Sequence, residues 1–408
     1  MRTVIAGYGI EGKASYEYWR AKGDEVAIAD ERADLADAPA DTRLILGPDA
    51  FAQLGEFDRV VRSPSVRPDK LPYGDKVWSA TNEFFAQCPA PIIGVTGTKG
   101  KGTTCSLITS ILRAAGKTVH LVGNIGQPAL DGLPSITPDD IVVYELSSFQ
   151  LWDLHASPHI AVVLMIEPDH LDVHADFAEY VAAKANIAVH QSDRDVIVFH
   201  SGNDTSRQIA AQSSAQKREY PFAIDEFLSS LQIPGAHNQE NAAAAIAAVR
   251  EYVTDPDIIR QGLASFTGLP HRLKFVAEVD GVRYYDDSIA TTPGSAIAAL
   301  KAFVQPKVII LGGSDKGADY TDVIEVCRET ESQVIAIGQT GLVIRELCAK
   351  LGVVCTRVDG GMAEVVREAH ELAHAGDVVI LSPASASFDQ YRSYADRGEQ
   401  FTAAVAAL

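Results

Sequence analysis

Short apolar runs, most of them followed by glycine or a carboxylate, recur along the chain between longer stretches of helical spacing. Runs this short are typical of buried strands. Those predicted in the first half are Thr3–Ala6, Val26–Ala29, Leu44–Leu46, Arg59–Val61, Ile92–Val95, Thr118–Val122, Ile141–Tyr144, Ile160–Met165 and Val196–Phe199. Their alternation with helical patterns predicts the α/β class, with parallel sheets covered by helices.

The second half of the chain continues the pattern. Lys274–Val279 and Val282–Tyr285 flank Asp280-Gly281, which predicts a tight hairpin. The further predicted strands are Val308–Gly313, Val334–Gly338 and Val378–Leu381. The polar segment 202–218 is predicted as surface turns. The alanine-rich run 241–249 is predicted as a helix, with His237 and Asn238 capping its start.

These elements predict three domains. The first, over residues 1–87, is Rossmann-like. The second, over 88–270, is P-loop ATPase-like with a mixed, largely parallel sheet. The third, over 271–408, is again Rossmann-like.

One glycine-rich turn carries the strongest chemical signal. It follows the apolar run ending at Val95 and precedes a predicted helix over 105–115. A strand, a Gly-Lys turn and a helix form a phosphate cradle, in which Lys101 reaches the terminal phosphates. The predicted ATP-phosphate residues are Gly97, Thr98, Lys99, Gly100, Lys101, Gly102, Thr103 and Thr104. Gly102 stands where a P-loop usually has the Mg²⁺-binding hydroxyl, so Thr103 is the nearest substitute.

A second glycine turn, Gly7-x-Gly9-x-x-Gly12, follows the first predicted strand, and Asp30 ends the next one. This spacing favours a nucleotide or nucleotide-sugar site. The alternative is a glycine turn that serves only helix packing.

Carboxylate and imidazole groups follow two strands of the predicted P-loop domain. Glu145 comes directly after the run 141–144, and His170 lies in the segment 167–172. Oxygen ligands suit Mg²⁺ beside a triphosphate, so both residues are candidate metal ligands.

Composition narrows the function classes. The chain has 408 residues and a formal net charge of −19, which argues against a nucleic-acid partner. The scattered cysteines are Cys88, Cys105, Cys327, Cys348 and Cys355; they lack metal-site spacing and suit a reducing compartment. With no signal-like or membrane-length apolar run, we expect a cytoplasmic protein without a membrane partner, and a monomer.

Several motifs together resemble the Mur ligases, the ATP-dependent amino-acid ligases of peptidoglycan synthesis. They are the Gly-Lys turn, Glu145-Leu-Ser-Ser-Phe-Gln-Leu, Asp169-His170-Leu-Asp, His237-Asn238-x-x-Asn241 and Pro270-His271-Arg272. The string Leu-Ser-Ser-Phe-Gln-Leu, at 146–151, and the segment 381–391 are most similar to the branch that joins D-glutamate to UDP-N-acetylmuramoyl-L-alanine. The resemblance implies that the three domains bind the UDP-substrate, ATP and D-glutamate in that order. It also implies that ATP converts the substrate carboxylate to an acyl phosphate, which the amine attacks.

The resemblance also assigns residue roles. Lys101, Glu145, His170 and Lys184 are implied as catalytic, the last as a carbamate that holds a second Mg²⁺. Further ATP contacts are implied for Asn238, Asn241, Arg272 and Asp287. The residues implied for the UDP-substrate are Tyr8, Gly9, Ile10, Asp30, Glu31, Arg32, Ser63, Pro64 and Asn124. Those implied for D-glutamate are Thr291, Lys316, Ser387 and Tyr394.

Two residues depart from the family pattern. Gly102 gives a Gly-Lys-Gly-Thr turn of the kind seen in folylpolyglutamate synthases, and Ile289 replaces a usual lysine. Three alternatives stay open: a folylpolyglutamate synthase-type ligase, a dinucleotide-dependent oxidoreductase that reads its cofactor with the first domain, and a non-catalytic nucleotide-binding relative.

Overall fold

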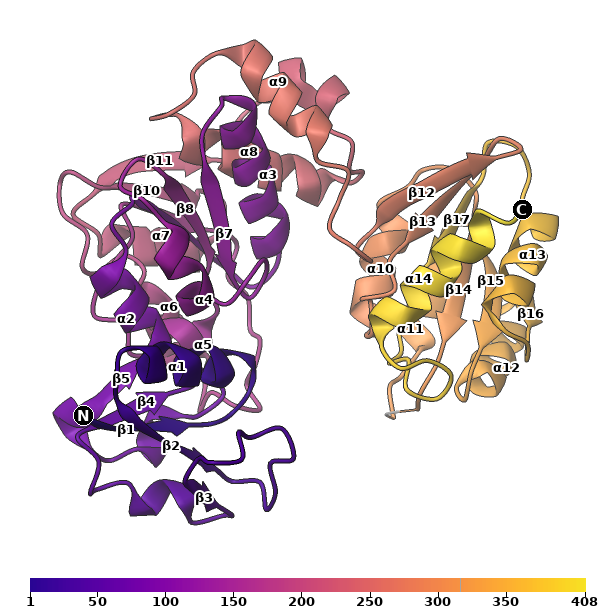
Figure 1. Cartoon of the computed structure of the whole chain (residues 1–408). Helices are drawn as coiled ribbons and strands as arrows, with labels where there is room; N and C mark the ends of the chain where they lie inside the picture. Colours follow the sequence, from indigo (N-terminus) through magenta and orange to yellow (C-terminus); the bar gives the residue numbers. More distant parts are fainter. Residues whose placement is uncertain (316) are drawn as a thin grey trace. The chain divides into compact units, whose positions relative to one another are not determined.

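The computed structural model describes residues 1–315 and 317–408 (Figure 1). The chain forms two compact units. Unit 1 comprises Met1–Leu228 and Glu240–Leu263, and unit 2 comprises Ser229–Gln239 and Ala264–Leu408. Unit 1 contains two sheets and unit 2 contains one. The α/β class predicted from the apolar runs is confirmed.

The first sheet has five parallel strands in the order β3-β2-β1-β4-β5. The strands are β1 (Arg2–Ala6), β2 (Glu25–Asp30), β3 (Leu44–Leu46), β4 (Arg59–Arg62) and β5 (Val77–Ser79), with helices α1 (Ile10–Ala21) and α2 (Ala80–Gln87). The strand order reverses between β1 and β4. In open parallel sheets ligands bind at the carboxyl ends of the strands at such a point, and here the loops after β1 and β4 start at Gly7 and Ser63.

The second sheet has the order β11-β10-β9-β6-β8-β7. Its strands are β6 (Ile92–Thr96), β7 (Val119–Gly123), β8 (Ile141–Glu145), β9 (Ile160–Val163), β10 (Val196–His200) and β11 (Gln216–Tyr220). Its helices are α3 (Lys101–Ala114), α4 (Ala129–Gly132), α5 (Ser148–Leu151), α6 (Phe177–Ala185), α7 (Asp204–Ala211), α8 (Ala236–Val249) and α9 (Pro256–Ser265). Every strand pair in this sheet is parallel, so the mixed sheet predicted for this domain is wrong in that detail.

Two local predictions also need correction. The segment 202–218 is not a turn region: it holds α7 and the first part of β11. Asn203 caps α7 by accepting a hydrogen bond from the Ser206 N–H (2.8 Å), and Ile209 is buried. The alanine-rich helix α8 starts at Ala236, so His237 and Asn238 lie in its first turn rather than before it.

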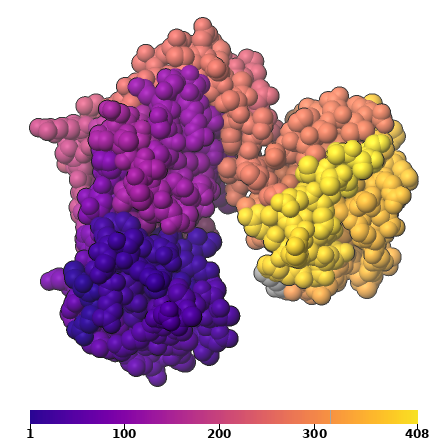
Figure 2. Space-filling model, in the orientation of Figure 1, coloured from indigo at the N-terminus to yellow at the C-terminus, as the bar shows by residue number. Residues whose placement is uncertain are grey.

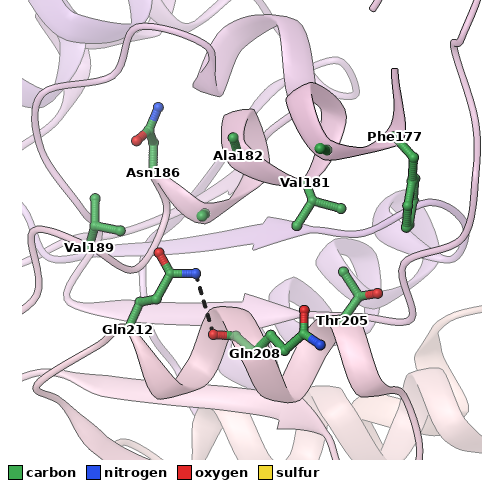
Figure 3. A pocket seen from close by; sticks show the side chains of 10 residues that line it. Phe177, Val181, Ala182, Asn186, Val189, Thr205, Gln208 and Gln212 are labelled. Atoms are coloured by element: carbon green, nitrogen blue, oxygen red, sulfur yellow. Dashed lines mark hydrogen bonds between the residues drawn. The ribbon is translucent and has the colours of Figure 1, made fainter.

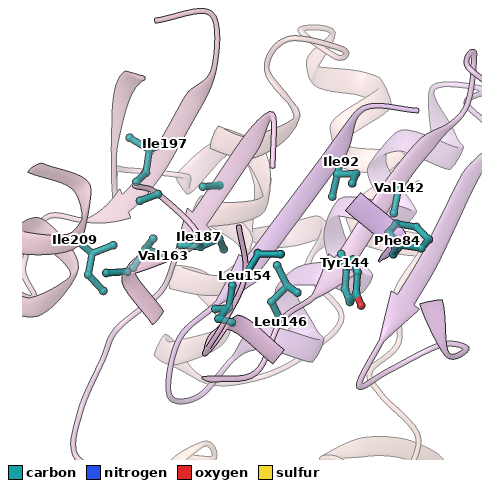
Figure 4. Packing of buried hydrophobic residues seen from close by; sticks show 14 of the residues in the cluster. Phe84, Ile92, Val142, Tyr144, Leu146, Leu154, Val163, Ile187, Ile197 and Ile209 are labelled. Atoms are coloured by element: carbon teal, nitrogen blue, oxygen red, sulfur yellow. The ribbon is translucent and has the colours of Figure 1, made fainter. Parts of the chain in front are cut away.

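The core of unit 1 joins elements of both sheets. Phe84 of α2 packs edge-on against Tyr144 of β8, with ring centroids 5.3 Å apart (Figure 4). Leu146, Leu154 and Ile187 belong to the same buried cluster. In the space-filling view the indigo N-terminal residues lie directly against the purple residues that follow them in the sequence (Figure 2). Unit 1 is therefore continuous across its two sheets.

Unit 2 contains the third sheet, in the order β12-β13-β17-β14-β15-β16. Its strands are β12 (Lys274–Val279), β13 (Val282–Asp286), β14 (Lys307–Gly312), β15 (Gln333–Ile337), β16 (Cys355–Arg357) and β17 (Val378–Leu381). Its remaining helices are α10 (Pro293–Lys301), α11 (Thr321–Glu329), α12 (Gly341–Leu351), α13 (Met362–Leu372) and α14 (Tyr394–Val405). The predicted hairpin at Asp280-Gly281 is confirmed as the antiparallel pair β12–β13, and the other pairs are parallel.

Candidate functional site

The glycine turn that joins β6 to α3 admits only glycine at two positions. Gly97 has φ 153° and Gly100 has φ 83°, where L side chains are strained. A Cβ on Gly97 would lie 2.5 Å from Leu164 Cβ, and one on Gly100 would lie 2.3 Å from Asn241 Oδ1. The turn leads into α3, whose first N–H groups and dipole favour a bound anion.

Lys101 is the first residue of α3 and its amine lies over the turn. Nζ donates hydrogen bonds to the carbonyl oxygens of Gly97 (3.1 Å) and Thr98 (3.0 Å). Thr104 Oγ1 donates to Asn241 Oδ1 of α8 (3.3 Å). The cation therefore stands at the phosphate turn, and Asn241 contacts that turn directly.

Lys184 of α6 contacts the same turn, although it is far from that turn in the sequence. Its side chain is buried, and the residue is 1% exposed. Its Nζ donates to Gly97 O (2.9 Å) and Thr96 Oγ1 (3.3 Å). Burial and then the charge of Lys101 lower the pKa of Lys184 far below its ordinary value, against the opposing effect of Asp169 and Glu145. The site favours a neutral amine at this position.

Glu145 ends β8 and is paired in register with Val95 of β6, so its carboxylate is placed beside the start of the phosphate turn. It is buried, and its charge acts on Lys184. The structure therefore brings Lys101, Glu145 and Lys184 together.

His170 follows β9 in the left-handed conformation, with φ 53°. Its ring lies 5.0 Å from that of Phe149 and 6.5 Å from that of Tyr180, and Tyr180 OH is 3.1 Å from Thr98 Oγ1. Within the part of the chain that the structure describes, no three His, Cys, Asp or Glu side chains converge as a preformed metal site. Glu145 and His170 are thus single candidate ligands and not a preformed cage. This is compatible with Mg²⁺, which takes one or two protein ligands together with substrate phosphates and water.

The glycine turn after β1 is held by Asp30. The carboxylate accepts hydrogen bonds from the N–H of Tyr8 (2.8 Å) and from Nε of Arg32 (2.9 Å). Burial raises the pKa of Asp30, but hydrogen bonds from Arg32 and Tyr8 outweigh it and lower the pKa to about 2. Asp30 is thus an ionised anchor for the turn, and Arg32 remains half exposed above it.

The other residues predicted for the UDP-substrate lie around this turn or after β7. Ser63 Oγ donates to Gly7 O (2.5 Å), and Glu31 pairs with Lys70 (2.7 Å). Ile10 is 77% exposed at the start of α1. Asn124 lies exposed in the turn that follows β7.

In unit 2 Asp287 directly follows β13, whereas Arg272 precedes β12 and Asn238 lies in the first turn of α8. Asp287 is buried and accepts hydrogen bonds from Ser382 Oγ (2.7 Å) and the Leu273 N–H (3.1 Å). Burial raises its pKa to about 7, although these hydrogen bonds and Arg272 oppose the shift. Asn238 Nδ2 donates to Pro234 O (2.6 Å).

The residues predicted for D-glutamate lie after β13 and β17, which are neighbours in the sheet. Ser387 is buried after β17, Thr291 is exposed after β13, and Tyr394 begins α14. The loop after β14 meets the loop after β17 through the Ser314 N–H, which donates to Ala386 O (2.8 Å). Lys316 lies outside the described residues.

A surface groove of about 500 Å³ lies elsewhere, between α6 and α7 (Figure 3). Its lining includes Phe177, Val181, Val189, Gln208 and Gln212 and none of the predicted site residues. Lys184, although it is on α6, is buried in the core instead.

Comparison with known proteins decides the family. The Mur ligase middle domain matches residues 95–227, and the Mur ligase glutamate ligase domain matches residues 271–385. The UDP-N-acetylmuramoylalanine–D-glutamate ligase of Symbiobacterium thermophilum is 36% identical over 447 residues, covering 100% of this chain and 98% of that protein. Its namesake in Acetivibrio thermocellus is 36% identical over 449 residues, covering 98% and 95%. The chain belongs to the Mur ligase family.

Solved structures share the Mur ligase fold at low sequence identity. The UDP-N-acetylmuramate–alanine ligase of Thermotoga maritima has a TM-score of 0.62 at 16% identity and covers 100% of this chain and 99% of that one. The bifunctional folylpolyglutamate synthase/dihydrofolate synthase of Yersinia pestis has a TM-score of 0.55 at 20% identity and covers 80% and 91%. These likenesses confirm the predicted fold.

Sequence reasoning missed two features of this Mur ligase site. Tyr180 joins Thr98 to α6, and Asp169 acts on Lys184. Tyr180 lies one helical turn before Lys184, and Asp169 directly precedes His170; these positions were the available signals.

Gly100→Ala should disable the phosphate turn, because the new methyl group would strike Asn241 and hold a strained φ. We expect ATP affinity, measured by calorimetry, to fall at least about tenfold. Gly116→Ala is the matched control: Gly116 follows the other end of α3 with φ 75° and nothing within 4 Å of the added Cβ. It should lower stability by about 1 kcal/mol and leave ATP affinity unchanged. Equal ATP affinity in both variants would contradict the assignment of the turn.

Proposed function

We propose that this Mur ligase joins D-glutamate to UDP-N-acetylmuramoyl-L-alanine at the expense of ATP, in cytoplasmic synthesis of the peptidoglycan precursor, as a monomer. The observation that carries the proposal is the convergence of Lys101, Glu145 and buried Lys184 on one phosphate turn. The proposed substrates are taken from the names of the relatives, which match this chain over nearly their full length.

The chemistry follows from the charges that the site holds. An oxygen of the substrate carboxylate attacks the γ-phosphorus of ATP, so that an acyl phosphate forms and ADP leaves. The neutral amine of D-glutamate attacks the acyl carbon, the resulting tetrahedral adduct loses phosphate, and the amine gives up a proton. Lys101 and the turn N–H groups stabilise the charge on the transferring phosphoryl group. Both partners of the first step are anions, so local cations are essential in a chain of net charge −19.

Glu145, His170, Thr103 and Lys184 are the residues proposed to hold Mg²⁺. When bound, the metal neutralises phosphate charge. Lys184 fits this role only as a carbamate, because an ammonium group repels a cation. A neutral buried amine can add to CO₂, lose a proton and become an anionic oxygen ligand, and the lowered pKa of Lys184 supports that reaction.

The substrate pockets follow the three sheets. We propose that the turn after β1 with Asp30, Glu31, Arg32, Ser63 and Pro64 holds the uridine diphosphate, and that Asn124 faces the muramoyl group. Asn238, Asn241, Arg272 and Asp287 would serve the nucleotide. Lys316 and Ser387 would bind the side-chain carboxylate of D-glutamate, with Thr291 near the α-carboxylate and Tyr394 as a wall. The domain boundaries at 87/88 and 270/271 belong to the same proposal.

ADP release tests the function against its alternatives. It should require UDP-N-acetylmuramoyl-L-alanine and D-glutamate together, and Lys101→Ala should lower turnover by at least about 10³-fold because it removes the main cation at the transferring phosphoryl group. Circular dichroism of the variant checks that it folds. Release driven by a folate substrate and glutamate would instead support the folylpolyglutamate synthase alternative, and no release under either condition would support the non-catalytic one.

Lys184→Ala should be inactive, and short carboxylic acids such as acetate should restore part of the activity, because they replace the carbamate oxygens. Tyr180→Phe, on the same helix, is a control that keeps Lys184 and should not respond to acetate. Activity of Lys184→Ala that stays at background across a range of acids would remove the main support for the carbamate.

A further inference from the structure

The loop that follows β4, over residues 63–67, is anchored at both ends to segments that surround the second sheet of unit 1. Arg62, the last residue of β4, has a fully buried side chain. Its Nε and Nη2 donate to the two carboxylate oxygens of Asp153 (2.7 and 2.5 Å), and Nη2 also donates to Phe149 O (2.9 Å). Nη1 donates to Val66 O (2.9 Å) within the loop itself. One guanidinium group thus joins the loop to α5 and the residues that follow it.

Arg67 forms a second anchor at the other end of this loop. Its guanidinium lies 5.0 Å from the Trp152 ring centroid, and Nη2 donates to Glu179 Oε1 (3.1 Å). Nη1 donates to Val173 O. Val173 lies three residues after His170, and Glu179 belongs to α6, the helix that carries Lys184.

A third contact lies between the glycine turn after β1 and the same part of the second sheet. Glu11 Oε1 accepts a hydrogen bond from Gln150 Nε2 (2.6 Å). The amide of Gln150 has a fixed orientation, because its Oε1 accepts from the Ser147 N–H (2.8 Å). Ser147 is two residues from Glu145.

These contacts have a common geometry. In the sequence, Arg62 and Arg67 flank Ser63 and Pro64, the residues proposed to hold the UDP-substrate. The arginine side chains contact the segments that follow Glu145 and His170. A guanidinium group that donates bidentately fixes direction as well as distance. A buried ion pair contributes little net stability compared with apolar packing, whereas it does specify one arrangement. Misplacement by about 1 Å of two reacting groups can cost about a hundredfold in rate.

We propose that Arg62 and Arg67 are positioning residues that fix the UDP-substrate loop against the two segments carrying the proposed metal ligands. They set the distance between the substrate carboxylate and the γ-phosphate of ATP. This inference rests on the proposed function, and it concerns residues that touch neither the substrate nor ATP in that account.

Arg62→Lys tests the proposal, because lysine keeps the charge and loses the bidentate geometry. Arg59→Lys is the matched control: Arg59 is the first residue of the same strand, and it pairs with Asp24 (3.1 Å), just before β2, and stacks on Trp19 of α1. In the ADP-release assay we expect Arg62→Lys to lower kcat at least tenfold, while the KM for ATP and for D-glutamate changes less than twofold. Arg59→Lys should match the wild type in all three.

Arg67→Lys is the second variant. The Arg67 side chain is partly exposed, so its substitution disturbs folding less, and this variant tests the proposal if Arg62→Lys fails to fold. It should lower kcat at least about threefold with the same KM values. A kcat within twofold of the control in a folded Arg62→Lys or Arg67→Lys protein would overturn the proposal. A wild-type enzyme that releases no ADP with both substrates would overturn the proposed function instead, so the two failures are distinguishable.

Discussion

The strands of a parallel sheet all end at the same edge, and this constraint brings the candidate functional residues that follow them close together. In the second sheet β6 lies between β8 and β9, so the phosphate turn, Glu145 and His170 follow three adjacent strands. In the first sheet β1 and β4 bring Gly7 and Ser63 together, and in the third β13, β17 and β14 do the same for Asp287, Ser387 and the loop at Ser314. Each set of residues is distant in sequence and is assembled by strand order alone.

Local charge, rather than overall charge, governs the site. The chain is strongly acidic, yet both substrates of the proposed first step are anions. Lys101 and Lys184 lie on either side of Gly97, and each donates to its carbonyl oxygen. Burial, and then the charge of Lys101, lower the pKa of Lys184, which is the direction that favours the neutral amine a carbamate requires. Lys101 is only half-buried at this turn, so the two lysines differ in how strongly burial disfavours the charged form.

Periodicity and turn chemistry predicted the parts of this structure that are locally determined. The apolar runs place β6, β8 and β17 to within one residue, because buried parallel strands are continuous hydrophobic segments. Among the helices of the described residues, none combines the length and the apolar character of a membrane span. The glycine pattern finds the phosphate turn because Gly97 and Gly100 must adopt φ values that other residues avoid. In contrast, β11 is a polar edge strand, and it gives no such run. The pairing of Arg62 with Asp153 joins residues far apart in the sequence, so no local pattern could predict it.

An acyl phosphate, formed where Lys101, Glu145 and Lys184 meet, is the central step of the proposed reaction. The most direct measurement follows oxygen atoms: UDP-N-acetylmuramoyl-L-alanine labelled with ¹⁸O in its carboxylate is turned over with ATP and D-glutamate, and the released phosphate is analysed by mass spectrometry. We expect one labelled oxygen in each phosphate, because the carboxylate oxygen that attacks phosphorus leaves with it. Unlabelled phosphate would exclude the acyl phosphate as an intermediate.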